Sequence, residues 1–313
     1  GGGHYQFAPA VAVVVVEACK FLASVGLMGV TSVTKLDGQA PVFERVSIQD
    51  IAILAVPGLV YTCNNILVFE AIQRVPIATF AVVRETRLIW NAVIWMAIFK
   101  VNIGWRRVFA IIGVLLACTA NQVPAMLRSE FSWNVLYAFL LAFLNAAGGV
   151  VCEFAMKRKA AMNINLQNAI IYTSCSSLAL LYIAAFRPHV FVSAKAFFAG
   201  FEPSCLQVIV LQVINGLTVS RILKHVESIT KSMVGAFCSP VVCFTGAWAL
   251  HTKLHANEVV ASVVVVAACC YFLRQGPLNT VPPLPPSSTK AKAFVLQKDG
   301  LAAGPLAAEG KAV

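Results

Sequence analysis

Charged residues are scarce in this sequence: Asp, Glu, Lys and Arg make up 12% of the 313 residues, whereas 59% are hydrophobic. Soluble domains carry about 25% charged residues, so this chain could not cover the surface of a water-soluble fold. In lipid the backbone must satisfy its own hydrogen bonds, which leaves α-helices or closed β-barrels. The apolar runs are roughly 18 to 24 residues long, which suits helices and not the shorter alternating strands of a barrel. The composition therefore predicts an all-α membrane protein, a polytopic helical bundle.

Motifs for catalysis and for metal binding are also missing. The sequence has no GxxxxGK[ST], HExxH or GxSxG motif and no paired carboxylates in a suitable context. The ten cysteines fall almost entirely within apolar segments and show no CxxC or Cys/His spacing. This pattern favours buried thiols that pack as small hydrophobes. We therefore expect no catalytic residue, no metal site and no cofactor, and we predict that the protein is not an enzyme.

Nine apolar segments are predicted to cross the membrane, within a transmembrane domain at residues 1–274. Several connections are very short, so successive helices should be antiparallel neighbours. Residues 275–313 contain a proline-rich stretch followed by Lys, Ala and Gly, which predicts a disordered cytosolic tail. The predicted spans are Phe7–Val30, Ile51–Ile72, Ile77–Phe99, Val108–Val123, Trp133–Phe154, Asn168–Phe186, Leu206–Leu223, Ser232–Leu250 and Val259–Leu273.

The distribution of Lys and Arg agrees with these spans. The net charge of +11 would suggest a nucleic-acid partner in a soluble protein, but the basic residues lie mainly between the apolar runs and in the tail. If the first span ends in the cytosol, 16 Lys and Arg residues lie on the cytosolic side, 5 on the other side and 3 within spans. This asymmetry follows the positive-inside rule. We expect membrane lipid around the chain, no nucleic-acid partner, and the N-terminus on the non-cytosolic side.

Two ionisable residues inside the first span require an explanation, because a charge at membrane depth costs ~2.5–3.5 kcal/mol on insertion scales. Glu17 and Lys20 are three residues apart and so share one face of a helix. One interpretation is an ion pair that neutralises itself. The other is that the Lys20 ammonium reaches into a polar cavity, which makes Lys20 a candidate substrate ligand.

The span Ile77–Phe99 carries a polar stripe. Arg84, Arg87 and Asn91 follow a spacing of three and four residues, so they lie on one helix face. Two arginines turned toward lipid would be very unfavourable, which favours a water-filled cavity. Because guanidinium groups bind phosphate and carboxylate well, Arg84 and Arg87 are candidate ligands. The alternative is a structural ion pair with a glutamate such as Glu85.

Amide and aromatic residues form pairs on two other spans. Tyr61 and Asn65 are four residues apart, and Asn168 and Tyr172 repeat this arrangement. Such pairs could hold a nucleotide base by its edge and its face, or they could make interhelical hydrogen bonds worth about 0.6 kcal/mol each. The neighbouring polar residues Asn64 and Ser174 complete this set of candidates.

Several blocks of the sequence form a known pattern. Residues 13–20 read VVVVEACK, 57–65 PGLVYTCNN, 78–87 ATFAVVRETR, 216–217 GL and 224–231 KHVESITK. They are similar to the motifs E-x-x-K, P-x-L-x-Y-x-x-Q-N-N, A-T-Y-Q-V-x-Y-Q-L-K, G-L and K-Y-A-D-N-I-x-K. From Phe7 to Leu273 the chain thus resembles the nucleotide-sugar transporters of the drug/metabolite transporter superfamily, especially the CMP-sialic acid/UDP-galactose branch.

The resemblance implies a fold of ten helices in two inverted halves around a central cavity. Because the chain opens at Gly1 and enters a helix within a few residues, we expect that it has nine of these spans and that the first helix is missing. The family's basic motif near the substrate path corresponds to Lys224 and Lys231. The positions at which family members contact the nucleotide-sugar correspond to Lys20, Asn65, Arg87, Asn168, Tyr172 and Ser174. The chain departs from the family pattern at Asn64, Phe80, Arg84, Arg87, Asn145 and Gln167.

The function that the resemblance implies is exchange across the Golgi or endoplasmic reticulum membrane. A pyrimidine nucleotide-sugar, of the CMP-sialic acid or UDP-galactose type, would enter from the cytosol, and a nucleoside monophosphate would return. One alternative is a carrier of the same superfamily for another phosphorylated solute. The other is a membrane scaffold that transports nothing. The assembly is left open, with a homodimer as one option.

Overall fold

The computed structural model describes residues 8–34, 46–126, 133–160, 162–249, 251, 255–276 and 278. The chain divides into two units, residues 1–280 and residues 281–313, and all described residues belong to the first. The predicted tail therefore lies almost entirely outside the described residues, as do the first seven residues of the chain.

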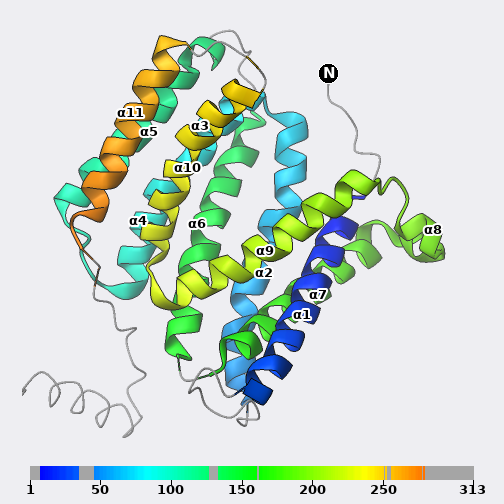
Figure 1. Cartoon of the computed structure of the whole chain (residues 1–313). Helices are drawn as coiled ribbons and strands as arrows, with labels where there is room; N and C mark the ends of the chain where they lie inside the picture. The colour runs from blue at the N-terminus through cyan, green and yellow to red at the C-terminus, as the bar shows by residue number, and fades with distance from the viewer. Residues whose placement is uncertain are drawn as a thin grey trace, which may run out of the picture. The chain divides into compact units, whose positions relative to one another are not determined.

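The described residues form helices and no strand, which confirms the predicted all-α fold (Figure 1). The α-helices are α1 (Pro9–Thr34), α2 (Ile48–Arg74), α3 (Ile77–Glu85), α4 (Arg87–Phe99), α5 (Trp105–Met126), α6 (Val135–Arg158), α7 (Ile164–Phe186), α8 (Ala194–Phe197), α9 (Pro203–His225), α10 (Ser228–Ala249) and α11 (Ala256–Leu273). A short 3-10 helix, η1 (Pro188–Val192), precedes α8.

Within the described residues, seven helical segments are long and apolar enough to cross a membrane, and they belong to α1, α2, α6, α7, α9, α10 and α11. Large tryptophans stand exposed at helix ends, with Trp105 at the start of α5, Trp133 just before α6 and Trp248 near the end of α10. Tryptophan at such positions is typical of the membrane–water interface. The chain is a multi-pass membrane protein, and the count of nine spans stays a prediction.

The predicted span Ile77–Phe99 is the element that differs most from its expected form. It consists of two helices, α3 and α4, which meet at Thr86. The Thr86 hydroxyl donates to the Val83 carbonyl at 2.6 Å, and back-bonding of this kind bends helices. The polar stripe predicted on one straight helix is therefore divided between two helices.

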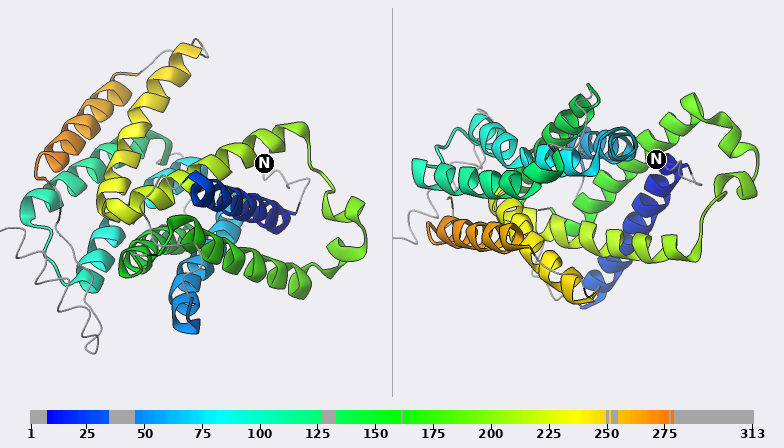
Figure 2. Two further views of the ribbon diagram at one scale, coloured as in Figure 1. Left: turned by 60° about the horizontal axis from the view of Figure 1, so that its bottom comes forward. Right: turned by 90° about the horizontal axis from the view of Figure 1, so that it is seen from above.

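The helices pack in two groups that share α6. α1 packs along α7, and α2 packs against α6 and α7, with α9 crossing α1 and α6. In the other group α4 and α3 pack on α6, α5 runs beside α11, and α10 contacts α4 and α11 (Figures 1 and 2). Figure 1 shows α9 and α10 meeting end to end at an angle. This joint brings the start of α10 beside α4 and α6.

Each group has its own apolar core. Trp95, Leu88 and Met233, all almost fully buried, are part of the cluster between α4, α5, α10 and α11. Leu54 and Met156 belong to a second cluster between α2, α6, α7 and α9. The outward faces of the helices also carry many exposed apolar side chains. This is expected for helices surrounded by lipid, because an apolar side chain is as favourable against lipid as in the protein interior.

Candidate functional site

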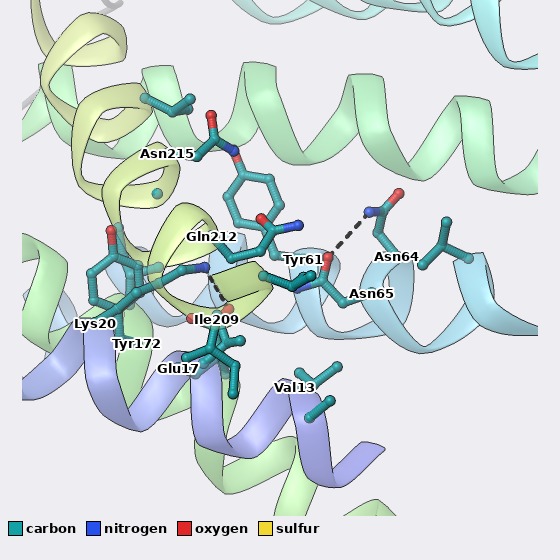
Figure 3. Close-up of a pocket in the computed structure, with 18 of the residues that line it drawn as sticks. Val13, Glu17, Lys20, Tyr61, Asn64, Asn65, Tyr172, Ile209, Gln212 and Asn215 are labelled. Atoms are coloured by element: carbon teal, nitrogen blue, oxygen red, sulfur yellow. Dashed lines mark hydrogen bonds and ion pairs between the residues drawn. The ribbon is translucent and has the colours of Figure 1, made fainter. Parts of the chain in front are cut away.

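A cavity of about 520 Å³ lies between α1, α2, α6, α7, α9 and α10 (Figure 3). Small-molecule sites in proteins measure about 300–1,000 Å³, so a nucleotide-sized ligand is within its range. One part of its wall is apolar and includes Val13, Val68 and Ile209. The rest is unusually polar for the interior of a membrane protein and gives the cavity its chemistry.

The ion pair, one of the two interpretations that the sequence left open for Glu17 and Lys20, forms at this wall. Lys20 Nζ donates to Glu17 Oε1 at 2.8 Å, and both side chains are nearly buried. The same ammonium lies 5.5 Å from the centre of the Tyr172 ring, within range of a cation–π interaction. Gly216 of α9 packs against this lysine: a Cβ atom there would lie 2.6 Å from Lys20 Cε. The glycine therefore leaves the space that the lysine side chain occupies.

Lys231 of α10 is a second cation in the cavity wall. Its side chain is partly buried, within electrostatic range of the Arg87 guanidinium and of the Cys152 thiol of α6. Glu17, Lys20 and Lys231 are the Asp, Glu, Lys and Arg side chains of the described lining, and their formal charges sum to +1. An anionic ligand is the partner that this charge favours.

Six carboxamide side chains line the cavity. Asn64 Nδ2 donates to Asn65 Oδ1 at 3.4 Å, and Asn168 Nδ2 donates to the Ser220 hydroxyl at 2.9 Å. Figure 3 shows Gln212 between Lys20 and Asn65. The six are Asn64 and Asn65 on α2, Asn145 on α6, Asn168 on α7, and Gln212 and Asn215 on α9.

Several buried polar atoms at the cavity wall lack a hydrogen-bond partner among the described residues: Glu17 Oε2, Asn64 Oδ1 and Asn168 Oδ1. The hydroxyl groups of Tyr61 and Tyr172 also make no hydrogen bond of normal geometry, although they lie beside Cys152 and Ser220. Buried polar groups are normally bonded, so this cluster offers hydrogen-bonding capacity to a polar ligand or to water in the cavity.

The cavity brings together six of the ten residues that the sequence predicts as substrate ligands, from four helices. These are Lys20, Asn64, Asn65, Asn168, Tyr172 and Lys231. The other four, Arg84, Arg87, Ser174 and Lys224, do not line it.

The two arginines gather around one carboxylate where α3 meets α4. Arg84 Nη2 lies 3.7 Å from Glu85 Oε1 and Arg87 Nη2 lies 3.4 Å from it. Arg84 is half exposed and also lies over the Phe80 ring, 6.0 Å from its centre. This is the structural ion pair that the sequence left open as an alternative. Asn91, the third residue of the predicted stripe, bonds to α10 instead.

Ser174 and Lys224 bind backbone carbonyls. The Ser174 hydroxyl donates to Ile171 at 2.8 Å and to Ala55 at 3.3 Å, in the interface of α2 and α7. Lys224 Nζ donates to the Met162 carbonyl at 3.0 Å, just before α7. Both contacts join neighbouring segments and lie outside the cavity lining.

The cavity also contains residues that sequence reasoning did not select, chiefly Gln212 and Asn215 of α9. They stand three residues apart in an apolar span, and Asn215 precedes Gly216 of the GL block. The sequence signal that could have identified them is the presence of two polar amides within an apolar span. No group of three or more His, Cys, Asp or Glu side chains within the described ranges could hold a metal ion.

Comparison with known proteins finds nucleotide-sugar transporters, both by family model and by individual relatives. The nucleotide-sugar transporter family model matches residues 3–273. A CMP-sialic acid transporter 2 of Oryza sativa is 24% identical over 240 residues, covering 73% of this chain and 65% of the rice protein. The rat protein named "Probable UDP-sugar transporter protein SLC35A4" is 25% identical over 291 residues and 86% of each chain. A UDP-N-acetylglucosamine transporter of Bos taurus is 22% identical over 57% of each chain.

One solved crystal structure shares the fold, with a TM-score of 0.63 at 12% identity, covering 86% of this chain and 90% of the other. The described residues thus form an all-helical membrane protein with a polar internal cavity. Since the family model spans most of its length, the chain belongs to the nucleotide-sugar transporter family. The alignment spans just under two thirds of the rice relative's length.

Proposed function

We propose that this protein carries a nucleotide-sugar across a Golgi or endoplasmic reticulum membrane and returns a nucleoside monophosphate in exchange. The observation that carries the proposal is the cavity, where two lysines and six carboxamides from several helices face one space of about 520 Å³. The family relationship supports the same function. Lys20, Asn64, Asn65, Asn168, Tyr172 and Lys231 are the proposed substrate ligands.

The phosphate groups are assigned to Lys20 and Lys231. Both ammonium groups belong to a buried wall with little competing negative charge, since Glu17 is the sole acidic side chain of the described lining. A charge-assisted hydrogen bond to phosphate is roughly twice as strong as a neutral one. Monophosphate and nucleotide-sugar both carry phosphate, so the two lysines can hold each ligand in turn.

The base and the sugar are assigned to the amide and phenol groups. The open atoms of Asn64, Asn168, Tyr61 and Tyr172 supply acceptors and donors that a pyrimidine edge can use. Gln212 and Asn215 add uncharged amides that suit the hydroxyl groups of a sugar. The site is thus expected to take a pyrimidine nucleotide with an attached sugar, as in CMP-sialic acid or UDP-galactose.

Exchange follows from using one site for both ligands. In the family's inverted-repeat architecture of ten helices, two halves rock around a central site and expose it to each side in turn. An empty cavity keeps its net positive charge, which disfavours the intermediate closed to both sides. A bound phosphate neutralises this charge in either direction, and transport should therefore require a ligand on both sides.

A double variant tests the proposal without leaving a lone buried charge. Glu17→Gln with Lys20→Met replaces the 2.8 Å ion pair by neutral groups of similar shape. Because a hydrogen bond to a charged group contributes about 1.5–3 kcal/mol, UMP or CMP affinity should fall about 10- to 100-fold, at about 1.4 kcal/mol per tenfold. Thermal-shift titrations of the purified protein with CMP, UMP, GMP and AMP measure this, and liposomes preloaded with monophosphate measure exchange.

The matched control is Glu70→Gln with Arg74→Met, which removes an exposed ion pair of 2.9 Å at the end of α2. It should leave nucleotide affinity unchanged. A folded wild-type protein that binds no nucleotide at millimolar concentration, or a cavity variant with wild-type affinity, would refute the proposed site.

A further inference from the structure

A second buried polar cluster lies outside the cavity lining, at the start of α10. Its centre is Glu153 of α6, whose side chain is fully buried. The carboxylate accepts from Lys157 Nζ at 2.7 Å, from the indole nitrogen of Trp95 at 3.1 Å, and from the backbone N–H of Ser228 at 2.7 Å. One carboxylate therefore joins α4, α6 and the first residue of α10.

Asn91 of α4 bonds to the first turn of α10 from another side. Its amide donates to the Ser232 hydroxyl at 2.9 Å, and its carbonyl accepts from the Ser228 hydroxyl at 3.1 Å. Gly149 of α6 approaches closely, since a Cβ atom there would lie 3.8 Å from Ser228 Cβ. The first turn of α10 is thus bonded on both sides, to α4 and to α6.

This turn carries a cavity residue. Lys231 follows Ser228 by three residues, so it lies one turn further along the same helix. Just before α10 the chain leaves α9 at His225 and passes through Val226 in extended conformation. Covalent continuity with α9 thus sets the angle of α10 only loosely, and the bonds from Glu153 and Asn91 add a directional constraint to the apolar packing of Met233.

We propose that Glu153 is a positioning residue for substrate binding: by anchoring the first turn of α10 it places the Lys231 ammonium in the cavity. This inference rests on the proposed function, in which Lys231 contacts the phosphate. Glu153 itself does not line the cavity. Its effect on a ligand therefore passes through Lys231.

The carboxylate suits this role better than an apolar side chain would. A buried ion pair is often replaceable by apolar residues without loss of stability, so the effect assigned to this carboxylate is on geometry. A carboxylate at the N-terminus of a helix accepts the free N–H groups there and interacts favourably with the helix dipole. Both interactions are directional and hold α10 in one orientation relative to α4 and α6.

A double-mutant cycle tests the inference with UMP and CMP as probes. Glu153→Gln keeps the shape but places an amide donor among the Lys157, Trp95 and Ser228 donors. In the presence of Lys231 it should lower monophosphate affinity about fivefold, a typical coupling between residues of one network. In a Lys231→Met background, which retains Lys20, the same change should have no effect on affinity.

The outcomes separate the two proposals. Wild-type protein that binds neither monophosphate contradicts the proposed function and removes the basis of this inference. Wild-type binding with an equal loss from Glu153→Gln in both backgrounds, or with no loss in either, overturns the inference and leaves the proposed function standing. If Glu153→Gln does not fold, Trp95→Phe removes one donor from the same carboxylate and replaces it in the cycle. Thr62→Val, at the α2–α7 interface, is the control for loss of a buried hydrogen bond elsewhere.

Discussion

The two buried polar clusters of this protein differ in how completely their hydrogen bonds are made. Around Glu153, both carboxylate oxygens and both amide atoms of Asn91 have partners. Around the cavity, Glu17 Oε2, Asn64 Oδ1 and Asn168 Oδ1 have none among the described residues. A fully bonded buried network fixes a structure, whereas polar groups without a partner at a cavity can bond to a ligand or to water. Changes in the first cluster should therefore affect folding first, and changes in the second should affect binding first.

The largest expected effect is on stability and comes from Glu153→Ala. It removes the carboxylate that accepts from the Lys157 ammonium, the Trp95 indole and the Ser228 N–H. Removing one partner of a buried ion pair typically costs about 3–5 kcal/mol. The unfolding temperature of the ligand-free protein in detergent should fall by many degrees. Asn64→Ala at the cavity is the comparison and should leave that temperature close to wild type; equal temperatures for both variants would contradict the distinction.

Substitutions at two glycines, Gly58 and Gly216, are expected to have effects of intermediate size that separate folding from binding. Gly58→Ala places a Cβ atom 1.9 Å from Ser174 Oγ and 2.7 Å from the Ile171 carbonyl oxygen. Because the backbone of α7 cannot move aside easily, we expect a loss of about 1–3 kcal/mol in unfolding free energy, as for other overpacked sites. Nucleotide affinity of the folded fraction should change little.

Gly216→Ala should show the opposite profile. Its Cβ atom would meet the flexible end of Lys20, 2.6 Å from Cε and 3.1 Å from Nζ. Lys20 can move at low cost, so the unfolding temperature should change little, while monophosphate affinity should fall about threefold or more as the ammonium is displaced. Thermal unfolding and nucleotide titration of both variants provide the measurement. If both variants changed the unfolding temperature and the monophosphate affinity alike, the distinction between a site that affects folding and a site that affects binding would be wrong.

The smallest expected effect concerns Arg87, where the sequence prediction and the cavity differ most. The family position predicts a phosphate ligand and a loss of about 10- to 100-fold on substitution by alanine. In the structure the guanidinium lies 3.4 Å from Glu85 and does not line the cavity. We expect Arg87→Ala to change monophosphate affinity by less than about threefold, through its electrostatic effect on Lys231. A tenfold loss, with partial recovery in Arg87→Lys, would assign it to the phosphate after all.

Much of the fold follows directly from the sequence. Long apolar runs predict helices in lipid without knowledge of any contact, and the all-α architecture agrees. The break at Thr86 could not be read in this way, since no glycine or proline marks it and the hydroxyl bonds within its own turn. Both arginines contact Glu85 and Asn91 bonds to α10, so the predicted stripe does not line the cavity.

The location of the cavity was predictable in part. Helical spacing pairs Tyr61 with Asn65 and Asn168 with Tyr172, and all four reach the cavity. Ser174 follows Tyr172 by two residues and therefore points elsewhere on α7, toward the backbone of α2. Gln212 and Asn215 were missed because which face of α9 turns inward depends on packing against α1 and α6, and a single apolar run does not encode it.

The ion pair between Glu17 and Lys20 has a consequence for how fast the proposed carrier can work. In the proposed cycle a phosphate at Lys20 shares the ammonium with Glu17, which already accepts one of its hydrogen bonds at 2.8 Å. Each ~1.4 kcal/mol lost through this sharing lowers affinity tenfold. Among related complexes such losses appear mainly as faster dissociation. In the proposed cycle the internal carboxylate would thereby shorten the residence time of the ligand and let the cavity empty on the far side.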